Sequence, residues 1–216
     1  MGILSAQEPI LDYIEAHIDK EHPYLYRLWR ETNIYLLRGH MASGHLQGVL
    51  LRMLVEMLRP QRILEIGTYT GYSALSMAAG LGDGALIDTY EINEELEDFT
   101  RPRIEQSPWA DKVRFHVGDV LKELRDCANE YDLVFLDGNK RQYEQYYELC
   151  KRVLRSRGVI LADNTLWDGH VCDPAYDRDA QTQGIRRFND LVAADPLVER
   201  VILPLRDGLT IIRMRE

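Results

Sequence analysis

Three oxygen-bearing side chains directly follow two apolar, β-branched runs in this chain of 216 residues. Asp137 follows the run 132–136, and Asp163 and Asn164 follow the run 158–162. If the two runs are neighbouring parallel strands, about 4.8 Å apart, these side chains converge at one edge of the sheet. Two carboxylates and an amide, without His or Cys, suit a hard octahedral cation such as Mg²⁺, with Ca²⁺ or Mn²⁺ as substitutes. The alternative is that Asp163 and Asn164 only cap turns.

Lys140 lies three residues after Asp137 and can reach the same edge of the sheet. An ammonium group is disfavoured close to a divalent cation, so a lysine placed there suits the role of a base. Taken alone, the residue reads as a solvated surface lysine. Tyr143 and Tyr147, four residues apart in the following helical run, are interpreted as packing residues.

A turn with two glycines, Gly67 and Gly71, follows the run 62–66 and precedes a helical segment. Glycines there allow a ligand to approach the backbone, and ligands of open α/β sheets bind outside the carboxyl ends of the strands. The next run, 85–90, is followed by Glu91, an acid at the place where such folds bind ribose hydroxyls. The spacing is not Gly-x-Gly-x-x-Gly, which favours S-adenosylmethionine over NAD. Without Glu91, the glycines would indicate only a tight turn.

The elements that must position these residues alternate between strand and helix. The expected parallel strands, buried between helix layers, are 62–66, 85–90, 113–117, 132–136 and 158–162. Helical runs follow at 140–156 and 180–194. The runs 199–204 and 208–213 are joined by three residues, too few for a parallel crossover, so they must pair antiparallel. We therefore predict a doubly wound, Rossmann-like α/β fold whose seven-stranded sheet is mainly parallel and ends in a C-terminal antiparallel hairpin.

Residues 1–60 carry a helical pattern of apolar residues and no strand signal. Ile10, Ile14 and Ile18 recur at intervals of four, which contributes to a prediction of about three N-terminal helices. Together with an α/β core at 61–216, these helices are expected to form a single domain, residues 1–216.

Composition limits the classes of partner. The 26 basic against 35 acidic residues give a net charge of −9, which disfavours nucleic acid as the main partner. Three cysteines without Cys-x-x-Cys spacing suggest neither a disulfide framework nor a zinc site. No targeting signal and no apolar stretch near the roughly 20 residues of a membrane span are visible. We expect a cytoplasmic protein without membrane contact.

Five blocks between residues 40 and 213 resemble the cation-dependent class I O-methyltransferases, which include catechol and caffeoyl-CoA O-methyltransferases and small bacterial relatives. The blocks are ILEIGTYTGYSAL (63–75), TYEIN (89–93), DLVFLDGNKRQYEQYY (132–147), ILADNTLWDG (160–169) and LPLRDGLTIIR (203–213). The resemblance implies that S-adenosylmethionine is bound by Met41, Glu65, Gly67, Ser73, Glu91, Asp119 and Asp137. Within this set Gly67 and Ser73 hold the methionine part, Glu91 holds the ribose, Asp119 lies at the adenine, and Met41 lies near the sulfonium.

The same resemblance assigns Asp137, Asp163 and Asn164 as metal ligands and Lys140, with Asp137, as catalytic residues. Trp167 falls in a segment that borders the acceptor in relatives. The implied mechanism is that the metal lowers the pKa of a bound acceptor hydroxyl, Lys140 takes the proton, and the oxygen displaces the sulfonium methyl in line.

The chain departs from the family pattern at one position of this block. Small bacterial members usually read Asp-Ala-Asp-Lys where this chain has Asp-Gly-Asn-Lys at 137–140, so Asn139 removes one negative charge beside the metal. We expect metal affinity and acceptor choice to differ. The N-terminal segments build the acceptor pocket and the dimer contact in this family, so a homodimer and a small hydroxylated acceptor are expected.

Two other functions remain open at this point. The first is methylation of a hydroxylated uridine in tRNA, which would require a basic rim from Arg101, Arg103, Lys140, Arg141, Arg186 and Arg187. The second is a non-catalytic S-adenosylmethionine-binding protein, which would be expected to lose Lys140 or a metal ligand. An NAD-dependent dehydrogenase is disfavoured by the glycine spacing.

Overall fold

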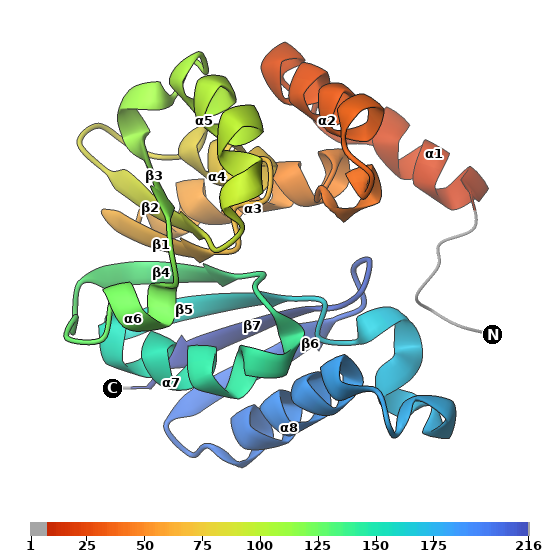
Figure 1. Ribbon diagram of the computed structural model, residues 1–216, viewed down its shortest axis with the longest axis vertical. Helices are drawn as coiled ribbons and strands as arrows, with labels where there is room; N and C mark the ends of the chain where they lie inside the picture. The colour runs from red at the N-terminus through yellow and green to blue at the C-terminus, as the bar shows by residue number, and fades with distance from the viewer. Residues whose placement is uncertain (1–7, 216) are drawn as a thin grey trace. The chain divides into compact units, whose positions relative to one another are not determined.

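The structure, a computed structural model, describes residues 8–215 (Figure 1). By their contacts these residues form two compact units, one of residues 63–67 and 119–215 and one of residues 8–62 and 68–118. The assignment of all 216 residues to one domain stays a prediction.

The described residues contain a seven-stranded sheet with the order β3-β2-β1-β4-β5-β7-β6. The strands are β1 Arg62–Ile66, β2 Leu86–Glu91, β3 Val113–Val117, β4 Tyr131–Leu136, β5 Leu154–Asp163, β6 Val198–Leu203 and β7 Leu209–Met214. The pairs β1 with β4, β2 with β3, and β4 with β5 are parallel, whereas β7 is antiparallel to both β5 and β6. The predicted fold class is confirmed. Each predicted strand is present with ends shifted by at most one residue, except that β5 begins four residues before the predicted start.

In the unit of residues 63–67 and 119–215, two helices lie on one face of the strands β4, β5, β7 and β6 (Figure 1). They are α7 Tyr143–Val153 and α8 Ala180–Ala194. The buried residues of α7 recur at helical spacing, so one stripe of the helix faces the sheet. The unit also contains α6 Val120–Glu123 and the 3₁₀ turns η4 Lys140–Gln142, η5 Trp167–Cys172 and η6 Pro174–Tyr176.

The predicted end of the helical run 140–156 is wrong. The helix ends at Val153, and β5 begins at Leu154, which pairs with Tyr131 of β4 across an irregular register. Residues 155–157 are exposed and polar, and Arg157 has a positive φ of 64°. These three residues therefore lack the apolar alternation by which a strand is recognised in a sequence.

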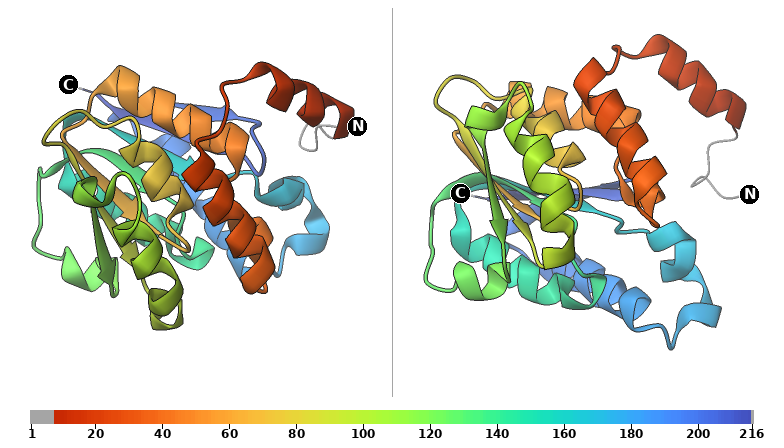
Figure 2. Two further views of the ribbon diagram at one scale, coloured as in Figure 1. Left: turned by 90° about the horizontal axis from the view of Figure 1, so that it is seen from above. Right: turned by 45° about the horizontal axis from the view of Figure 1, so that its top comes forward.

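The unit of residues 8–62 and 68–118 contains the N-terminal helices, α1 Glu8–His17, α2 Pro23–Tyr35 and α3 His45–Leu58. They agree with the three predicted helices, although residues 1–7 lie outside the described part. Further along are α4 Tyr72–Ala78, α5 Glu97–Glu105 and the 3₁₀ turns η1 Gly39–Met41, η2 Glu94–Leu96 and η3 Ala110–Lys112. Helix α3 packs on α4 through Gly48, and α1 contacts α3 and projects outward from its unit (Figure 2). No helix within residues 8–215 is long and apolar enough to cross a membrane.

Candidate functional site

Asp137 and Asp163 lie at the same edge of the sheet, as the sequence predicted. Leu136 of β4 is paired with Ala162 of β5, so the residues that follow them, Asp137 and Asp163, are neighbours. Asp163 is buried, and about a quarter of the Asp137 side chain is exposed. Burial raises the pKa of Asp137 to about 6, the charge of Lys140 opposes this shift, and the charge of Asp163 adds to it. The two carboxylates therefore repel each other in a poorly solvated place.

Lys140 is a buried residue of this site and not a surface lysine, since only 7% of it is exposed. Its Nζ donates a hydrogen bond to Oδ1 of Asp137 at 2.6 Å and another to the hydroxyl of Tyr143 at 3.0 Å. Asn139 caps the turn that carries the lysine, because its Oδ1 accepts a hydrogen bond from the Arg141 N–H at 3.2 Å. The asparagine at position 139 can therefore cap this turn in place of the aspartate that small bacterial relatives usually carry there.

Asn164 and Trp167 lie in a tight segment that follows β5. Both have positive φ angles, 58° and 47°. The Asn164 N–H donates to Oδ1 of Asp163 at 2.8 Å, so Asp163 does stabilise a local turn, as the alternative interpretation proposed. The segment is also held to the turn 205–208: the Thr165 N–H donates to Gly208 O at 3.0 Å and the Leu166 N–H to Asp207 O at 2.7 Å.

The residues at this edge fit a hard divalent cation in donor type. Asp137, Asp163 and Asn164 each carry a side-chain oxygen, and oxygen is the donor that a hard divalent cation prefers. Within residues 8–215 no group of three or more His, Cys, Asp and Glu side chains is arranged to hold a metal, so the predicted set depends on the Asn164 amide as its third donor. The two neighbouring carboxylates supply the repulsion that a bound cation relieves.

Glu91, the predicted ribose ligand, is buried at the end of β2. Its Oε2 accepts a hydrogen bond from the Tyr69 N–H at 2.8 Å, and its Oε1 accepts one from the Asn93 N–H at 2.9 Å. Burial raises the pKa of Glu91, and these backbone N–H groups oppose the shift. A carboxylate oxygen has two lone pairs, so both oxygens can still accept a hydroxyl.

The two glycines of the turn after β1 are required by the fold itself. Gly67 has φ 98° and Gly71 has φ 85°, in the region that favours glycine. A Cβ at Gly67 would lie 2.2 Å from the carbonyl oxygen of Asp137, so no other residue fits there without movement of the backbone. Gly71 is the N-cap of α4, and Ser73 is buried in the first turn of that helix.

The remaining predicted cofactor residues have varied surroundings. Glu65 is fully buried in β1. Asp119 is the N-cap of α6, where its Oδ1 accepts a hydrogen bond from the Leu121 N–H at 3.1 Å. Met41 lies in η1 and is about half exposed. Their contacts with S-adenosylmethionine stay predictions.

Three residues at these places were not recognised from the sequence as functional candidates. Tyr143, interpreted as packing, bonds Lys140, and the i, i+3 spacing of the two residues is a signal that could have found it. Tyr69 has a positive φ of 48° and donates its N–H to Glu91, while its hydroxyl is buried without a hydrogen-bond partner among the described residues. Asp207 has a raised pKa, caused by burial and by the charge of Asp168. No local pattern reveals the last two.

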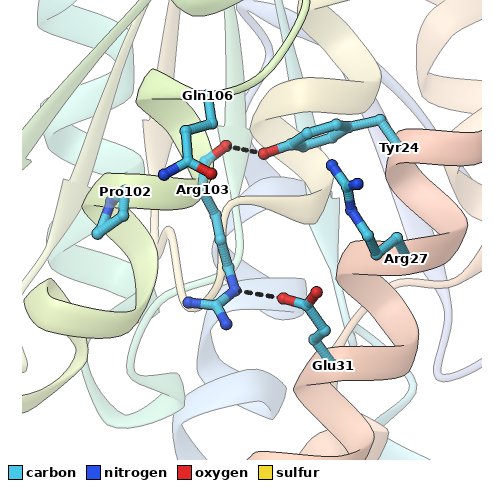
Figure 3. Close-up of a pocket in the computed structure, with 6 residues that line it drawn as sticks. All are labelled: Tyr24, Arg27, Glu31, Pro102, Arg103 and Gln106. Atoms are coloured by element: carbon cyan, nitrogen blue, oxygen red, sulfur yellow. Dashed lines mark hydrogen bonds and ion pairs between the residues drawn. The ribbon is translucent and has the colours of Figure 1, made fainter.

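A shallow polar pocket of about 380 Å³ lies elsewhere, in the unit of residues 8–62 and 68–118 (Figure 3). In it the Tyr24 hydroxyl donates to Arg103 O at 2.5 Å, and Nε of Arg103 is 2.9 Å from Oε2 of Glu31. Arg103, a residue of the basic rim considered for tRNA, lines this pocket, whereas none of the predicted catalytic, cofactor or metal residues does.

Comparison with known proteins shows a consistent similarity over nearly the whole chain. A family model described as O-methyltransferase matches residues 15–215. The chain is 36% identical over 188 residues to a caffeoyl-CoA O-methyltransferase of Mesembryanthemum crystallinum, covering 80% of this chain and 72% of that protein. It is 34% identical over 226 residues to caffeoyl-CoA O-methyltransferase 1 of Arabidopsis thaliana, covering 97% of this chain and 86% of that protein.

Solved structures show the same similarity in three dimensions. An O-methyltransferase from Bacillus cereus, in complex with S-adenosylhomocysteine, has a TM-score of 0.87 at 29% identity over 96% of this chain and 97% of that chain. The O-methyltransferase TomG from Streptomyces achromogenes, involved in tomaymycin synthesis and in complex with S-adenosylmethionine, has a TM-score of 0.87 at 27% identity over the whole of both chains.

Proposed function

Because this chain belongs to the O-methyltransferase family and is an S-adenosylmethionine-dependent enzyme, we propose that its acceptor is a small catechol-like molecule and that the transfer depends on a divalent cation. The single observation that carries this proposal is the pair of neighbouring carboxylates, Asp137 and Asp163, with the buried Lys140 hydrogen-bonded to one of them. Membership of this family of methyl-transferring enzymes also argues against two other functions, a non-catalytic binding protein and a dehydrogenase.

In the proposed reaction, Lys140 is the base. It accepts the proton of the acceptor hydroxyl while the oxygen forms a bond to the methyl carbon and the carbon–sulfur bond breaks. The products are the methyl ether, S-adenosylhomocysteine and one proton, so the step balances. Asp137 holds the lysine in place through the 2.6 Å hydrogen bond, and the low solvent exposure of Lys140 excludes water that would compete for the proton.

The divalent cation, Mg²⁺ with Ca²⁺ or Mn²⁺ as substitutes, would be held by Asp137, Asp163 and Asn164. When bound, it would supply a Lewis acid that makes the acceptor hydroxyl more acidic and screens its negative charge. For the methyl donor we propose the residues predicted from the sequence, with Glu91 accepting hydrogen bonds from the ribose. Met41, Glu65, Gly67, Ser73, Asp119 and Asp137 complete the proposed donor contacts.

The charges of the predicted basic rim support a small acceptor over tRNA. Five of the six residues of this rim are paired with a carboxylate at 2.6 to 2.9 Å: Arg101 with Glu97, Arg103 with Glu31, Lys140 with Asp137, Arg186 with Asp177 and Arg187 with Glu144. A phosphate backbone would have to displace these carboxylates, whereas a neutral phenolic acceptor does not.

A screen of methyl acceptors by mass spectrometry tests the proposal. Small catechols and bulk tRNA are incubated with the enzyme and S-adenosylmethionine, each with Mg²⁺ and with excess chelator. We expect a mass gain of one methyl group on catechols only when Mg²⁺ is present. Methylation of tRNA alone would refute the catechol proposal in favour of tRNA. Methylation of catechols in excess chelator would refute the proposed dependence on a divalent cation.

A homodimer is proposed as the working assembly. Large apolar side chains are exposed on the three N-terminal helices: Ile10, Leu11, Tyr13, Tyr26, Trp29, Met53, Met57 and Leu58. Large exposed apolar side chains on neighbouring helices favour a surface that a second copy of the chain covers.

A further inference from the structure

The hydroxyl of Tyr143 connects the base to a neighbouring strand end. Tyr143 is fully buried, and its ring packs edge-on against two others. The distance between ring centroids is 5.3 Å to Phe188 and 6.3 Å to Tyr146. Its hydroxyl oxygen lies 3.0 Å from Nζ of Lys140, 2.9 Å from the carbonyl oxygen of Asp163 and 3.4 Å from that of Leu136. The packed ring thus fixes the hydroxyl between the base and two backbone carbonyls.

The partners of this hydroxyl fix the direction of its hydrogen bonds. A carbonyl oxygen can only accept, so the single proton of Tyr143 must be donated to a carbonyl, and Asp163 O is the closer one. The oxygen of Tyr143 is therefore left as an acceptor toward Lys140. The carboxylate of Asp137 also accepts from the same nitrogen at 2.6 Å.

A lysine nitrogen is tetrahedral and has three positions besides its carbon. In the base role proposed above, two of them are N–H bonds and the third faces the acceptor. Two fixed acceptors, Asp137 and Tyr143, take up two of the positions and leave the third for the acceptor proton. If Tyr143 did not accept, the amine could rotate and the lone pair would have no fixed direction.

We propose that Tyr143 is a positioning residue, whose hydroxyl orients the Lys140 amine so that its lone pair meets the acceptor proton. This inference rests on the proposed role of Lys140 as the base. It assigns a function to a tyrosine whose spacing alone indicates packing. The effect belongs to the chemical step, because Tyr143 is fully buried and its contacts are with the protein.

Tyr143→Phe removes the hydroxyl and keeps the ring contacts with Phe188 and Tyr146. We expect kcat to fall at least about tenfold, with the KM values for S-adenosylmethionine and for a catechol acceptor within about twofold of wild type. Tyr147→Phe is the matched control. It lies one turn further along α7, and its hydroxyl bonds Asp195 at 3.0 Å and not Lys140, so its kcat should stay within about twofold.

A merely structural role would act through Asp163 and would not need Lys140. We therefore measure Tyr143→Phe also in a Lys140→Met background, where we expect less than a twofold further loss of kcat. A full tenfold further loss in that background would overturn the proposal, as would an unchanged kcat in Tyr143→Phe alone.

The failure of the proposed base has its own signature. If Lys140→Met alone leaves kcat unchanged, the base assignment is wrong and the inference falls with it. If Lys140→Met is slow but Tyr143→Phe is not, only the inference fails. Circular dichroism and binding of S-adenosylhomocysteine establish that each variant is folded. If the phenylalanine variant does not fold, 4-aminophenylalanine at position 143 can be used instead. Its nitrogen still donates to a carbonyl but accepts poorly, because its lone pair is delocalised into the ring, so kcat should fall at least about tenfold. A wild-type kcat would overturn the proposal.

Discussion

At the scale of single residues, Glu91 has two functions to separate. It accepts backbone hydrogen bonds from Tyr69 and Asn93, and it is proposed to bind ribose. We expect Glu91→Ala to weaken binding of S-adenosylhomocysteine by about 1.5–3 kcal/mol, the usual loss for hydrogen bonds to a charged group. Isothermal titration calorimetry measures this change. Unchanged affinity would remove the ribose assignment.

The raised pKa of Glu91 also predicts a pH dependence. As the pH falls through this raised pKa, the carboxylate is protonated and loses acceptor capacity, so the affinity for S-adenosylhomocysteine should fall at a higher pH than for an ordinary glutamate. Glu91→Gln is the control, because it has nearly the same shape and does not titrate. An identical pH profile in both proteins would contradict the assignment.

Asp163 is the residue on which the cation proposal depends most. Asp163→Asn keeps an oxygen that can accept from the Asn164 N–H but removes one of the two charges. We expect the apparent Kd for Mg²⁺, measured from activity, to rise at least about tenfold, because charge count sets the affinity of such sites. Asp168→Asn, an exposed neighbour in η5, should change it by less than about threefold. Full activity of the wild type in excess chelator would refute the cation site.

At the scale of elements, the segment after β5 keeps its shape because the turn 205–208 holds it. Gly208 has φ 90°, and an added Cβ would lie 2.5 Å from the Leu166 side chain and 2.7 Å from its backbone nitrogen. We expect Gly208→Ala to lower the free energy of unfolding by roughly 2–4 kcal/mol through strain and overpacking. Urea denaturation measures this loss.

The matched control is Gly82→Ala, at an exposed glycine where no atom of the described residues lies within 4 Å of an added Cβ. Its free energy of unfolding should stay within about 0.5 kcal/mol of wild type. Equal stability of the two variants would show that the contact between the turn and the segment contributes little.

At the scale of the whole molecule, the choice of acceptor would follow from how many protein ligands hold the proposed cation. A divalent cation held by Asp137, Asp163 and Asn164 would have room for further oxygen ligands, and two adjacent hydroxyls would suit it better than one. A lone phenol would lose one anchor. We expect kcat/KM for a catechol to exceed that for its monohydroxy analogue by at least about tenfold at saturating Mg²⁺, or about 1.4 kcal/mol. Equal values would favour the tRNA base, where a single hydroxyl is the target.

The exposed apolar side chains of the N-terminal helices predict the oligomeric state. Light scattering should give the wild type about twice the chain mass of 25.1 kDa. Replacing Tyr13 and Met57 together by Lys should shift the protein toward monomers, because a charge would be buried in the contact. Ile202→Lys, on β6, is the control and should stay dimeric. A monomeric wild type would contradict the proposed assembly.

The sequence by itself determined the strands and the acidic residues at their ends, to which we assign the chemistry. Asp137, Asp163 and Glu91 each stand at or directly after the end of an apolar run, and a short apolar run bounded by turn residues is a local property that needs no tertiary contact. The antiparallel hairpin was equally determined, since three residues cannot make a parallel crossover. Where the signal was polar and exposed, as at 155–157, the element boundary was misplaced.

Only the tertiary structure decided what each of these side chains bonds. The partners of Glu91 depend on the left-handed backbone of Tyr69, and Lys140 is buried because α7 packs its tyrosines against β4, β5 and α8. Gly67 is required because the carbonyl of Asp137, seventy residues later, occupies the space of a Cβ. Such contacts bring together residues that are far apart in the chain, and packing sets their distances to a fraction of an ångström. Residue types and spacing do not determine distances with that precision.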